Sequence, residues 1–384
     1  MDRKRIVIIG NGIAAEKACA EALKEGKDAV SITLIGKEEY GPYPRPRLPE
    51  FLSGKIGKDV FTSKKFSDRK DITYIPGGAE DVDFQAKSVL LPGGKSIGYD
   101  SLVLCTGSVP NRLKIDGSDF DSIHSLRTID DAEEIISNLS STSSIVVIGA
   151  GLLGLEAALA LKKRTGIAVT VVESAKSLLP RELDEESASF LENMLIGKGL
   201  SFKKGASAAS YISKDGKSVS CVLFSDGNAV EASIVIEAIG VHPVFPFQVD
   251  GKIKIGRGIV INECAETSIE GVYAAGDAAE YDSRCPGLVS FALQSARVAG
   301  INAAGGNQKL ILPPSSTFMK VDDISIYSLG KIKGGNVVEK RSEGNLERFF
   351  ITEDGKVEGA IGVGKSVDMM KSLSFLGKPF SPEG

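Results

Sequence analysis

The chain has 384 residues, a length that suggests two or three domains. Apolar residues make up 42% and charged residues 25% of the composition, which is ordinary for a globular protein and argues against a disordered chain. Lysine and arginine number 46 against 50 aspartates and glutamates, so the net charge of −4 gives no bulk attraction to nucleic acid or to an anionic membrane surface.

The sequence carries no signal for a membrane or for an oxidising compartment. No apolar run approaches the roughly 18 residues of a membrane-spanning helix, and Ile6–Ile9 is too short for the core of a signal peptide. Five widely spaced cysteines form no disulfide or zinc pattern: Cys19, Cys105, Cys221, Cys264 and Cys285. We therefore expect a cytoplasmic protein with reduced thiols and no metal site.

Short β-branched strands alternate with helical patterns, which predicts an α/β fold. The first unit comprises a strand, a helix and a strand over Ile6–Ile9, about Ala14–Glu25, and Ile32–Ile35. A second unit repeats the pattern over Ile145–Ile148, about Leu153–Lys163, and Val169–Val172. Because the pattern occurs twice, the sequence predicts two Rossmann-like nucleotide-binding folds.

The segments around the second unit indicate that it is inserted into the first domain. A Pro- and Arg-rich stretch (Gly41–Pro49), a β-rich segment (Ile72–Leu91) and the strand Leu102–Cys105 precede it, and Ile234–Glu237 and Gly271–Gly276 follow with signals that match partner strands of the first unit. The predicted boundaries are 1–113 and 243–312 for the discontinuous first domain, 114–242 for the inserted domain, and 313–384 for a small α+β module. Strand-like runs and Pro313-Pro314 mark that module and its linker.

Each unit has a glycine-rich turn between its first strand and its helix. The first turn is a GxGxxA with Gly10, Gly12 and Ala15 in the key positions. The first glycine permits the tight turn, the second lets the backbone approach a pyrophosphate, and the small third residue allows close helix–strand packing. Phosphates would then lie at the helix N-terminus, where N–H groups are exposed.

The second turn is a full GxGxxG, formed by Gly149, Gly151 and Gly154. Glu173 ends the following strand, where a carboxylate accepts hydrogen bonds from a ribose diol and repels a 2′-phosphate. This favours NADH over NADPH, although the nearby Lys176 counts against that preference. The alternative is that Glu173 is only a solvated residue at the end of the strand. After the first turn, Glu38 is the nearest acidic candidate, although it could equally be solvated.

Further motifs in a fixed order resemble a known family. Leu104–Pro110 is similar to an ATG-type turn with Cys105 in place of alanine, Ala238–Pro243 is similar to its echo, and Gly271–Asp277 is similar to the motif whose aspartate binds the FAD ribityl chain. The set resembles the pyridine nucleotide–disulfide oxidoreductase superfamily over about residues 4 to 312. The resemblance implies a glutathione-reductase-like α/β fold that binds FAD in the first domain and NADH in the second.

Within the superfamily, Pro42–Leu48 resembles the flavin-contacting segment of rubredoxin and ferredoxin reductases. Leu179–Asp184 resembles a segment shared by NADH:rubredoxin reductases and the flavin part of NADH-dependent nitrite reductases, and Pro286–Leu288 and Met319–Ile326 resemble NADH:rubredoxin reductase. The resemblance implies that Thr106, Gly107 and Asp277 contact FAD. It also implies that Arg127 binds the FAD pyrophosphate and that Arg45 lies near the flavin or its phosphates. Two departures are Glu50, where ferredoxin-type reductases carry lysine, and the missing asparagine after Pro243.

Two residues are candidates for the chemistry itself. Glu156 matches the glutamate after GxGxxGxE, which implies a place near the nicotinamide or flavin N5, with a helix-surface role as the alternative. Lys320 could stabilise the anionic N1–C2=O side of a reduced flavin, or it could be a surface lysine. No cysteine lies between Gly36 and Gly77, so we expect electrons to leave the flavin without a disulfide relay. A distant pair, Cys264 and Cys285, stays open.

The resemblance implies an electron-transfer oxidoreductase that takes hydride from NADH onto FAD and passes electrons singly to a small acidic carrier such as rubredoxin. The tail has 10 Lys and Arg against 10 Asp and Glu, so a basic docking patch would have to be local or shared with Lys55, Lys58, Lys64 and Lys65. The short tail favours a monomer. The alternatives are the flavin component of an NADH-dependent nitrite reductase assembly and a non-catalytic FAD/NAD redox sensor.

Overall fold

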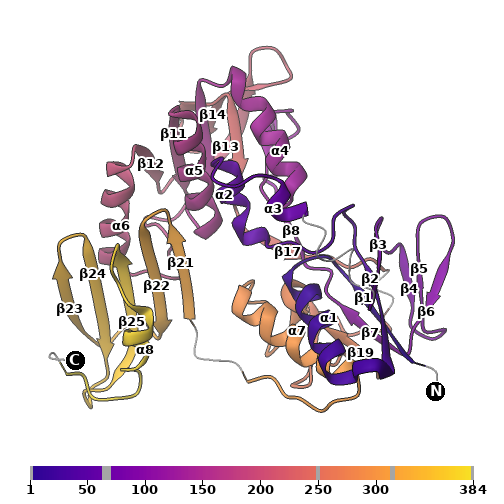
Figure 1. Cartoon of the computed structure of the whole chain (residues 1–384). Coiled ribbons are helices and arrows are strands. Elements are labelled where there is room, and N and C mark those ends of the chain that lie inside the picture. The colour runs from indigo at the N-terminus through magenta and orange to yellow at the C-terminus, as the bar shows by residue number, and fades with distance from the viewer. Residues whose placement is uncertain (1–2, 63–70, 248–250, 312–315, 382–384) are drawn as a thin grey trace. The chain divides into compact units, whose positions relative to one another are not determined.

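The structure is a computed structural model that describes residues 3–62, 71–247, 251–311 and 316–381 (Figure 1). Lys64, Lys65 and Pro313-Pro314 lie outside the described residues. The chain separates into two compact units: residues 1–47, 57–109 and 241–312 form the first, and residues 48–56, 110–240 and 313–384 form the second. Segment 48–56 thus belongs to the second unit, and the predicted domain boundaries stay a prediction.

The first unit is built on a parallel sheet with the order β3-β2-β1-β7-β19. These strands span Ile72–Ile75, Val30–Ile35, Lys4–Ile9, Ser101–Leu104 and Val272–Ala274. The apolar residues of β1 and β7 are buried on both faces, as expected of central strands in a covered parallel sheet. Helix α1 (Ile13–Gly26) follows β1, the central strand of this sheet. The glycine turn between them therefore lies at the carboxyl end of β1.

Helix α1 packs closely against α7 (Val289–Ala303). A Cβ on Gly300 would lie 2.4 Å from the carbonyl oxygen of Ala18, so only glycine allows this approach. Small buried residues line the contact: Ala14, Ala15, Ala18 and Ala22 on α1, and Ala292, Ala296, Ala299 and Ala303 on α7. The alanine-rich sequence of both helices therefore fixes α1 against its neighbour and holds its N-terminus in place.

The second unit contains a parallel sheet with the order β12-β11-β10-β16-β9. Its strands span Leu200–Lys204, Ala168–Glu173, Ser144–Ile148, Ile234–Glu237 and Ile123–His124. Ile234–Glu237 pairs with β10 of the second unit, although its apolar run also matched the partner strands of the first unit. A four-residue apolar run has no feature that names its partner strand, and only the fold decides between two similar sheets.

Three helices of the second unit follow strands of its parallel sheet: α4 (Ile129–Asn138), α5 (Leu152–Thr165) and α6 (Glu185–Gly197). The short helix α2 (Leu48–Leu52) comes instead from the Pro- and Arg-rich stretch. Helix α5 follows β10 as α1 follows β1, so the two units repeat the same strand–turn–helix arrangement. This confirms the predicted α/β class with two Rossmann-like folds.

Short sheets and one short helix complete the loops of the two units. The remaining elements are α3 (Asp59–Thr62), β4 (Asp81–Asp83), β5 (Ser88–Leu90), β6 (Ser96–Gly98), β8 (Ser108–Pro110), β13 (Ala208–Ser213), β14 (Val219–Phe224), β15 (Ala229–Glu231), β17 (Val241–Pro243), β18 (Ile259–Val260) and β20 (Ala279–Glu280). Among the described residues, none of the helices combines the length and the hydrophobicity that a transmembrane span requires.

The tail forms an antiparallel sheet with the order β21-β22-β25-β24-β23, drawn in orange to yellow in Figure 1. Its strands and one helix span Ser316–Val321, Ile324–Gly330, Val357–Gly364, Asn345–Ile351, Asn336–Ser342 and, for α8, Met369–Leu373. A core around Tyr327 and Phe349 joins the sheet to Phe375 and Phe380. The small α+β module expected from the sequence is therefore present.

A buried carboxylate holds the end of β16 in the second unit. Glu237 has a side chain that is 0% exposed, its Oε2 lies 2.8 Å from Nε of Arg112, and its Oε1 accepts a hydrogen bond of 2.7 Å from Tyr211. Leu113 N–H also points at this carboxylate. The charge is paired and hydrogen-bonded, as a buried charge has to be.

We expect Arg112→Ala to lower the free energy of unfolding by about 3 kcal/mol, because it leaves the Glu237 carboxylate buried without its cation. Urea unfolding followed by circular dichroism measures the loss. The matched control is Arg5→Ala, which removes an exposed pair with Asp100 and should cost much less, because solvent screens exposed pairs. Equal losses of unfolding free energy in the two variants would show that the buried Glu237 pair stabilises the fold no more than an exposed ion pair does.

Candidate functional site

The first glycine turn is shaped by close backbone approaches. Gly10 has a φ of +131°, and a Cβ there would lie 2.0 Å from the carbonyl oxygen of Cys105 at the end of β7. Around Gly12 the space is open, with nothing within 4 Å of an added Cβ. Gly12 is also the N-cap of α1 and makes no side-chain cap, while Ala15 is fully buried. The first N–H groups of α1 are therefore open to an anion.

The second turn repeats this geometry. Gly149 has a φ of +108°, and a Cβ there would lie 2.4 Å from the carbonyl oxygen of Ala238. An added Cβ on Gly154 would lie 2.0 Å from the Gly149 carbonyl oxygen, whereas nothing lies within 4 Å of one on Gly151. Gly151 is the uncapped N-cap of α5. Both turns thus pair glycines required by packing with one glycine that faces open space.

Glu173, at the end of β11, is directed at the second turn. Its carboxylate accepts hydrogen bonds of 2.8 Å from the backbone N–H groups of Ala150 and Ala175, and one of 3.1 Å from Ser174 Oγ. The side chain is held beside the glycine turn, which disagrees with a merely solvated strand-end residue. Lys176 is exposed.

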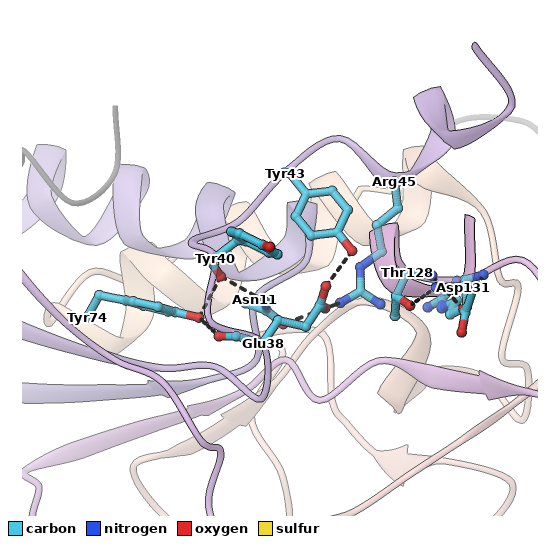
Figure 2. A network of polar contacts seen from close by, with 9 residues as sticks. Asn11, Glu38, Tyr40, Tyr43, Arg45, Tyr74, Thr128 and Asp131 are labelled. Atoms are coloured by element: carbon cyan, nitrogen blue, oxygen red, sulfur yellow. Dashed lines mark hydrogen bonds and ion pairs between the residues drawn. The ribbon is translucent and has the colours of Figure 1, made fainter. Parts of the chain in front are cut away.

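Glu38 is at the centre of a polar network in the first unit (Figure 2). Its Oε1 lies 2.5 Å from Nη2 of Arg45, and its Oε2 accepts a hydrogen bond of 2.5 Å from Tyr43. The Glu38 side chain is 12% exposed, whereas Glu39 is exposed. The alternative that Glu38 is merely solvated is wrong, because the loop Gly41–Arg47 folds back and pairs with it.

Two residues that the motifs did not single out extend this network. Asn11, buried between the two glycines of the first turn, donates to the carbonyl of Tyr40 and accepts a hydrogen bond of 3.3 Å from Arg45. Tyr74 donates to the carbonyls of Glu38 and Tyr40 at 2.6 Å. The only sequence signal was the place of Asn11 inside the glycine motif, because a loop-to-strand contact such as that of Tyr74 leaves no local pattern.

Thr106, Gly107 and Asp277 come together in the first unit. Thr106 Oγ1 donates to the carbonyl of Val244 at 2.6 Å, and Gly107 adopts a φ of +71°. Ser108, a neighbour that sequence reasoning had not assigned a role, donates to Oδ2 of Asp277 at 2.8 Å. The ATG-type turn and the aspartate motif, more than 160 positions apart, are thus joined by one hydrogen bond.

The position of Asp277 relative to α1 is fixed by Gly276. A Cβ on Gly276, which has a φ of +74°, would lie 2.9 Å from the Cβ of Ala14 in the first turn of α1. Gly276 N–H is held by Ser295 of α7 at 3.0 Å. The aspartate therefore lies beside the uncapped N-terminus of α1.

Arg127 lies in the second unit, directly before α4. Its backbone N–H donates to Asp131 at 2.8 Å, and Thr128 and Asp131 form a capping box at the start of α4. These two residues are also drawn in Figure 2. The cap fixes the backbone from which the Arg127 side chain projects.

The two candidates for the chemistry lie on elements of the second unit that contact each other, Glu156 on α5 and Lys320 on β21. Glu156 makes no hydrogen bond or ion pair with any described residue, and burial, followed by the neighbouring Glu50 carboxylate, raises its pKa to about 7. Lys320 is exposed on an edge strand. A carboxyl group with a raised pKa is what a residue that moves protons near neutral pH requires.

None of the five cysteines forms a disulfide. Cys105 is buried, and burial raises its pKa to about 12, so its thiol is unreactive and packs against the first glycine turn. Among the described residues there is also no cluster of three or more His, Cys, Asp or Glu that could hold a metal ion.

Two parallel sheets, each with a glycine turn at an uncapped helix N-terminus, define the class: a protein with two dinucleotide-binding folds. The model of the pyridine nucleotide-disulphide oxidoreductase family matches residues 4–300, and the chain belongs to this family. The resemblance drawn from the motifs is confirmed.

Known relatives cover nearly the whole chain. The NADH-rubredoxin oxidoreductase of Clostridium acetobutylicum is 30% identical and the match covers 97% of each chain. The assimilatory nitrate reductase electron transfer subunit of Bacillus subtilis is 29% identical over 98% of this chain, but the chain spans only 49% of that relative's length. The crystal structure of a ferredoxin reductase from Rhodopseudomonas palustris has a TM-score of 0.88 at 26% identity, covering 99% of this chain and 96% of that one.

Proposed function

We propose that the chain is an NADH-dependent flavoprotein reductase that passes electrons singly to a small redox carrier such as rubredoxin, without a redox-active disulfide. Membership of the family, with its NADH-dependent relatives, implies FAD and NAD(H) as cofactors. The observation that carries the proposal is the pair of open glycine turns, together with five cysteines of which none forms a disulfide.

The residues of the first glycine turn fit an FAD site. An open space at Gly12 beside the uncapped N-terminus of α1 suits a pyrophosphate. Arg45 has a buried Nε without a hydrogen-bond partner in the part of the chain that the structure describes, so it has a donor left for a phosphate or the flavin. The other residues of the first unit that would hold FAD are Gly10, Ala15, Glu38, Thr106, Gly107 and Asp277. The role of Arg127, which belongs to the second unit, stays a prediction from the resemblance.

The second turn would hold NADH, with Gly149, Gly151 and Gly154 around the pyrophosphate and Glu173 on the ribose. Bound FAD supplies hydride acceptance from NADH and release of electrons one at a time. The protein orients the two cofactors, and Lys320 would place positive charge where the reduced ring carries negative charge. Glu156 would hold or move a proton at its carboxyl group.

The relative from C. acetobutylicum favours rubredoxin as the carrier, because the match covers both chains almost completely. The B. subtilis relative favours a second candidate, the flavin component of a nitrite or nitrate reductase assembly, since this chain matches about half of that protein. Of the lysines considered for docking, Lys55 lies 3.8 Å from Glu50, and Lys58 lies over the ring of Tyr40.

The test is an anaerobic assay of the FAD-loaded protein with NADH and a panel of acceptors: rubredoxin, ferredoxin, nitrite and oxygen. We expect NADH to bleach the flavin rapidly and rubredoxin to be reduced faster than any other acceptor. Slow bleaching by stopped flow would favour the redox sensor instead. Equal rates with rubredoxin, ferredoxin and oxygen would contradict a carrier reductase, and co-purification with an iron–sulfur partner would favour the second candidate.

A cysteine series tests the absence of a sulfur relay. We expect the double variant Cys264→Ser/Cys285→Ser and the single variant Cys105→Ala to keep the wild-type rate of carrier reduction within about twofold, because none of these thiols is paired. Loss of carrier reduction with normal flavin bleaching in the double variant would show that a distant pair relays electrons.

A further inference from the structure

A short helix from the Pro- and Arg-rich loop brings a second carboxylate to Glu156. Helix α2 packs against α5, and Nη1 of Arg164 on α5 donates to the carbonyls of Phe51 and Leu52 at 3.5 and 3.3 Å. These bonds fix the end of α2 on α5. Glu50 is the only charged residue of α2, and its side chain is 32% exposed.

The two carboxyl groups differ in their surroundings. Glu50 has a cation within reach, since its Oε2 lies 3.8 Å from Nζ of Lys55. Glu156 has no hydrogen bond or ion pair to a described residue, and the Glu50 carboxylate acts on it together with burial. The negative charge of Glu50 disfavours the ionised form of Glu156 and so adds to the effect of burial in raising the pKa of Glu156.

The other charged groups around α5 do not neutralise Glu156. On α5 itself, Lys162 donates to the carbonyls of Gly166 and Ile167, and Lys163 pairs with Asp322. Of the strands that pack on α5, β10 has no charged residue. The charged residues of the other strands are Glu173 on β11, Lys203 and Lys204 on β12, and Lys320 on β21. Glu173 binds backbone N–H groups, and Lys203 and Lys204 pair with Asp226 and Glu192. Lys320 makes no hydrogen bond or ion pair with a described residue.

The proposed function creates a need for such a group. One NADH supplies two electrons and one proton as hydride, and two one-electron carriers remove only the electrons. One proton per NADH therefore has to leave the site each turnover. A carboxyl group that is neutral or ionised near pH 7 can accept that proton and release it to water.

We propose that Glu50 and Glu156 form a carboxyl pair that shares one proton, in which Glu156 accepts the proton left by each hydride and Glu50 is the positioning residue that keeps Glu156 ready to bind it. This rests on the proposed function for the source of the proton, whereas the pairing itself rests only on α2 and α5. Replacing Glu50 by glutamine removes its charge with little change in shape, and replacing it by lysine gives Glu156 a cation.

The experiment is a pH titration of the glutamate carboxyl carbons by ¹³C NMR, on the FAD-loaded protein labelled at glutamate Cδ. The Glu156 signal is assigned by its loss in Glu156→Gln. We expect this carboxyl to titrate near pH 7 in the wild type, to move toward 4.5 in Glu50→Gln, and to move further down in Glu50→Lys. The control is Glu231→Gln, because Glu231 is exposed on β15 and unpaired among the described residues; it should change nothing.

A second measurement on the same variants is the pH profile of carrier reduction. We expect the group that must be ionised for turnover to shift to lower pH in Glu50→Gln, in step with the NMR value. A Glu156 signal that titrates near 4.5 in the wild type, or that does not move in either Glu50 variant, would overturn the pair. A pair that titrates as expected in a protein whose flavin NADH does not bleach would instead refute the proposed function.

Discussion

A Gly12→Glu variant is expected to fold normally and to lose bound flavin by at least about tenfold. Nothing lies within 4 Å of a Cβ at this position, and the backbone there is extended, so the side chain causes no clash. Its carboxylate would occupy the uncapped N-terminus of α1, where it competes with and repels a pyrophosphate. Flavin absorbance per protein, with circular dichroism as the check on folding, measures the effect.

The matched variant is Gly151→Glu, which makes the same change in the second turn. We expect it to keep its yellow flavin and to lose reduction by NADH by at least about tenfold, because only the N-terminus of α5 is blocked. The pair of variants separates the two sites. Flavin loss in Gly151→Glu with retention in Gly12→Glu would reverse the assignment of FAD and NADH to the two folds. If both variants keep their flavin and its reduction by NADH, the assignment is refuted.

The second large effect is expected at Glu173, which should decide between NADH and NADPH. We expect Glu173→Gln to lower the preference for NADH, as the ratio of the two kcat/KM values, by about 100-fold. A like-charge contact with the 2′-phosphate costs several kcal/mol, and about 1.4 kcal/mol is a factor of ten. Glutamine keeps an oxygen that can accept the hydrogen bond from Ala150 or Ala175.

Steady-state rates of ferricyanide reduction with each nucleotide give this ratio without any need for the natural carrier. Glu231→Gln, which removes an exposed charge from β15, is the control and should leave the ratio unchanged. An unchanged ratio in Glu173→Gln would mean that the carboxylate faces the backbone alone and that another group selects the nucleotide. A fall in both rates by the same factor would point to a loosened glycine turn.

The carboxyl pair has a consequence for stability as well. The folded-state pKa of Glu156 lies above its ordinary value of 4.5, so this group favours the folded state at low pH and that contribution is lost as the pH rises through about 7. At neutral pH the desolvated Glu156 carboxylate lowers the free energy of unfolding. Such a loss of stability is typical of residues that serve chemistry.

Local patterns were enough to find the two glycine turns. Gly10 and Gly149 were predicted from their place after an apolar strand, and the structure gives the reason: each lies against the carbonyl of a neighbouring strand. The following helices and first strands were likewise predictable, since hydrophobic period and glycine position are local signals. The partner strand of Ile234–Glu237 could not be predicted in this way, because strand pairing is not local.

The α/β class, the repeated dinucleotide fold, the absence of close cysteine pairs and most of the residues around each turn follow from the amino-acid order alone. The folded chain was needed to show that Glu38 is paired with Arg45 and Tyr43, that Ser108 joins Asp277, and that the helix of Glu50 packs on the helix of Glu156. The physical reason is that these contacts depend on where a loop returns to the fold. Folding determines which groups lie near a charged side chain, and in this chain the Glu50 carboxylate acts on Glu156.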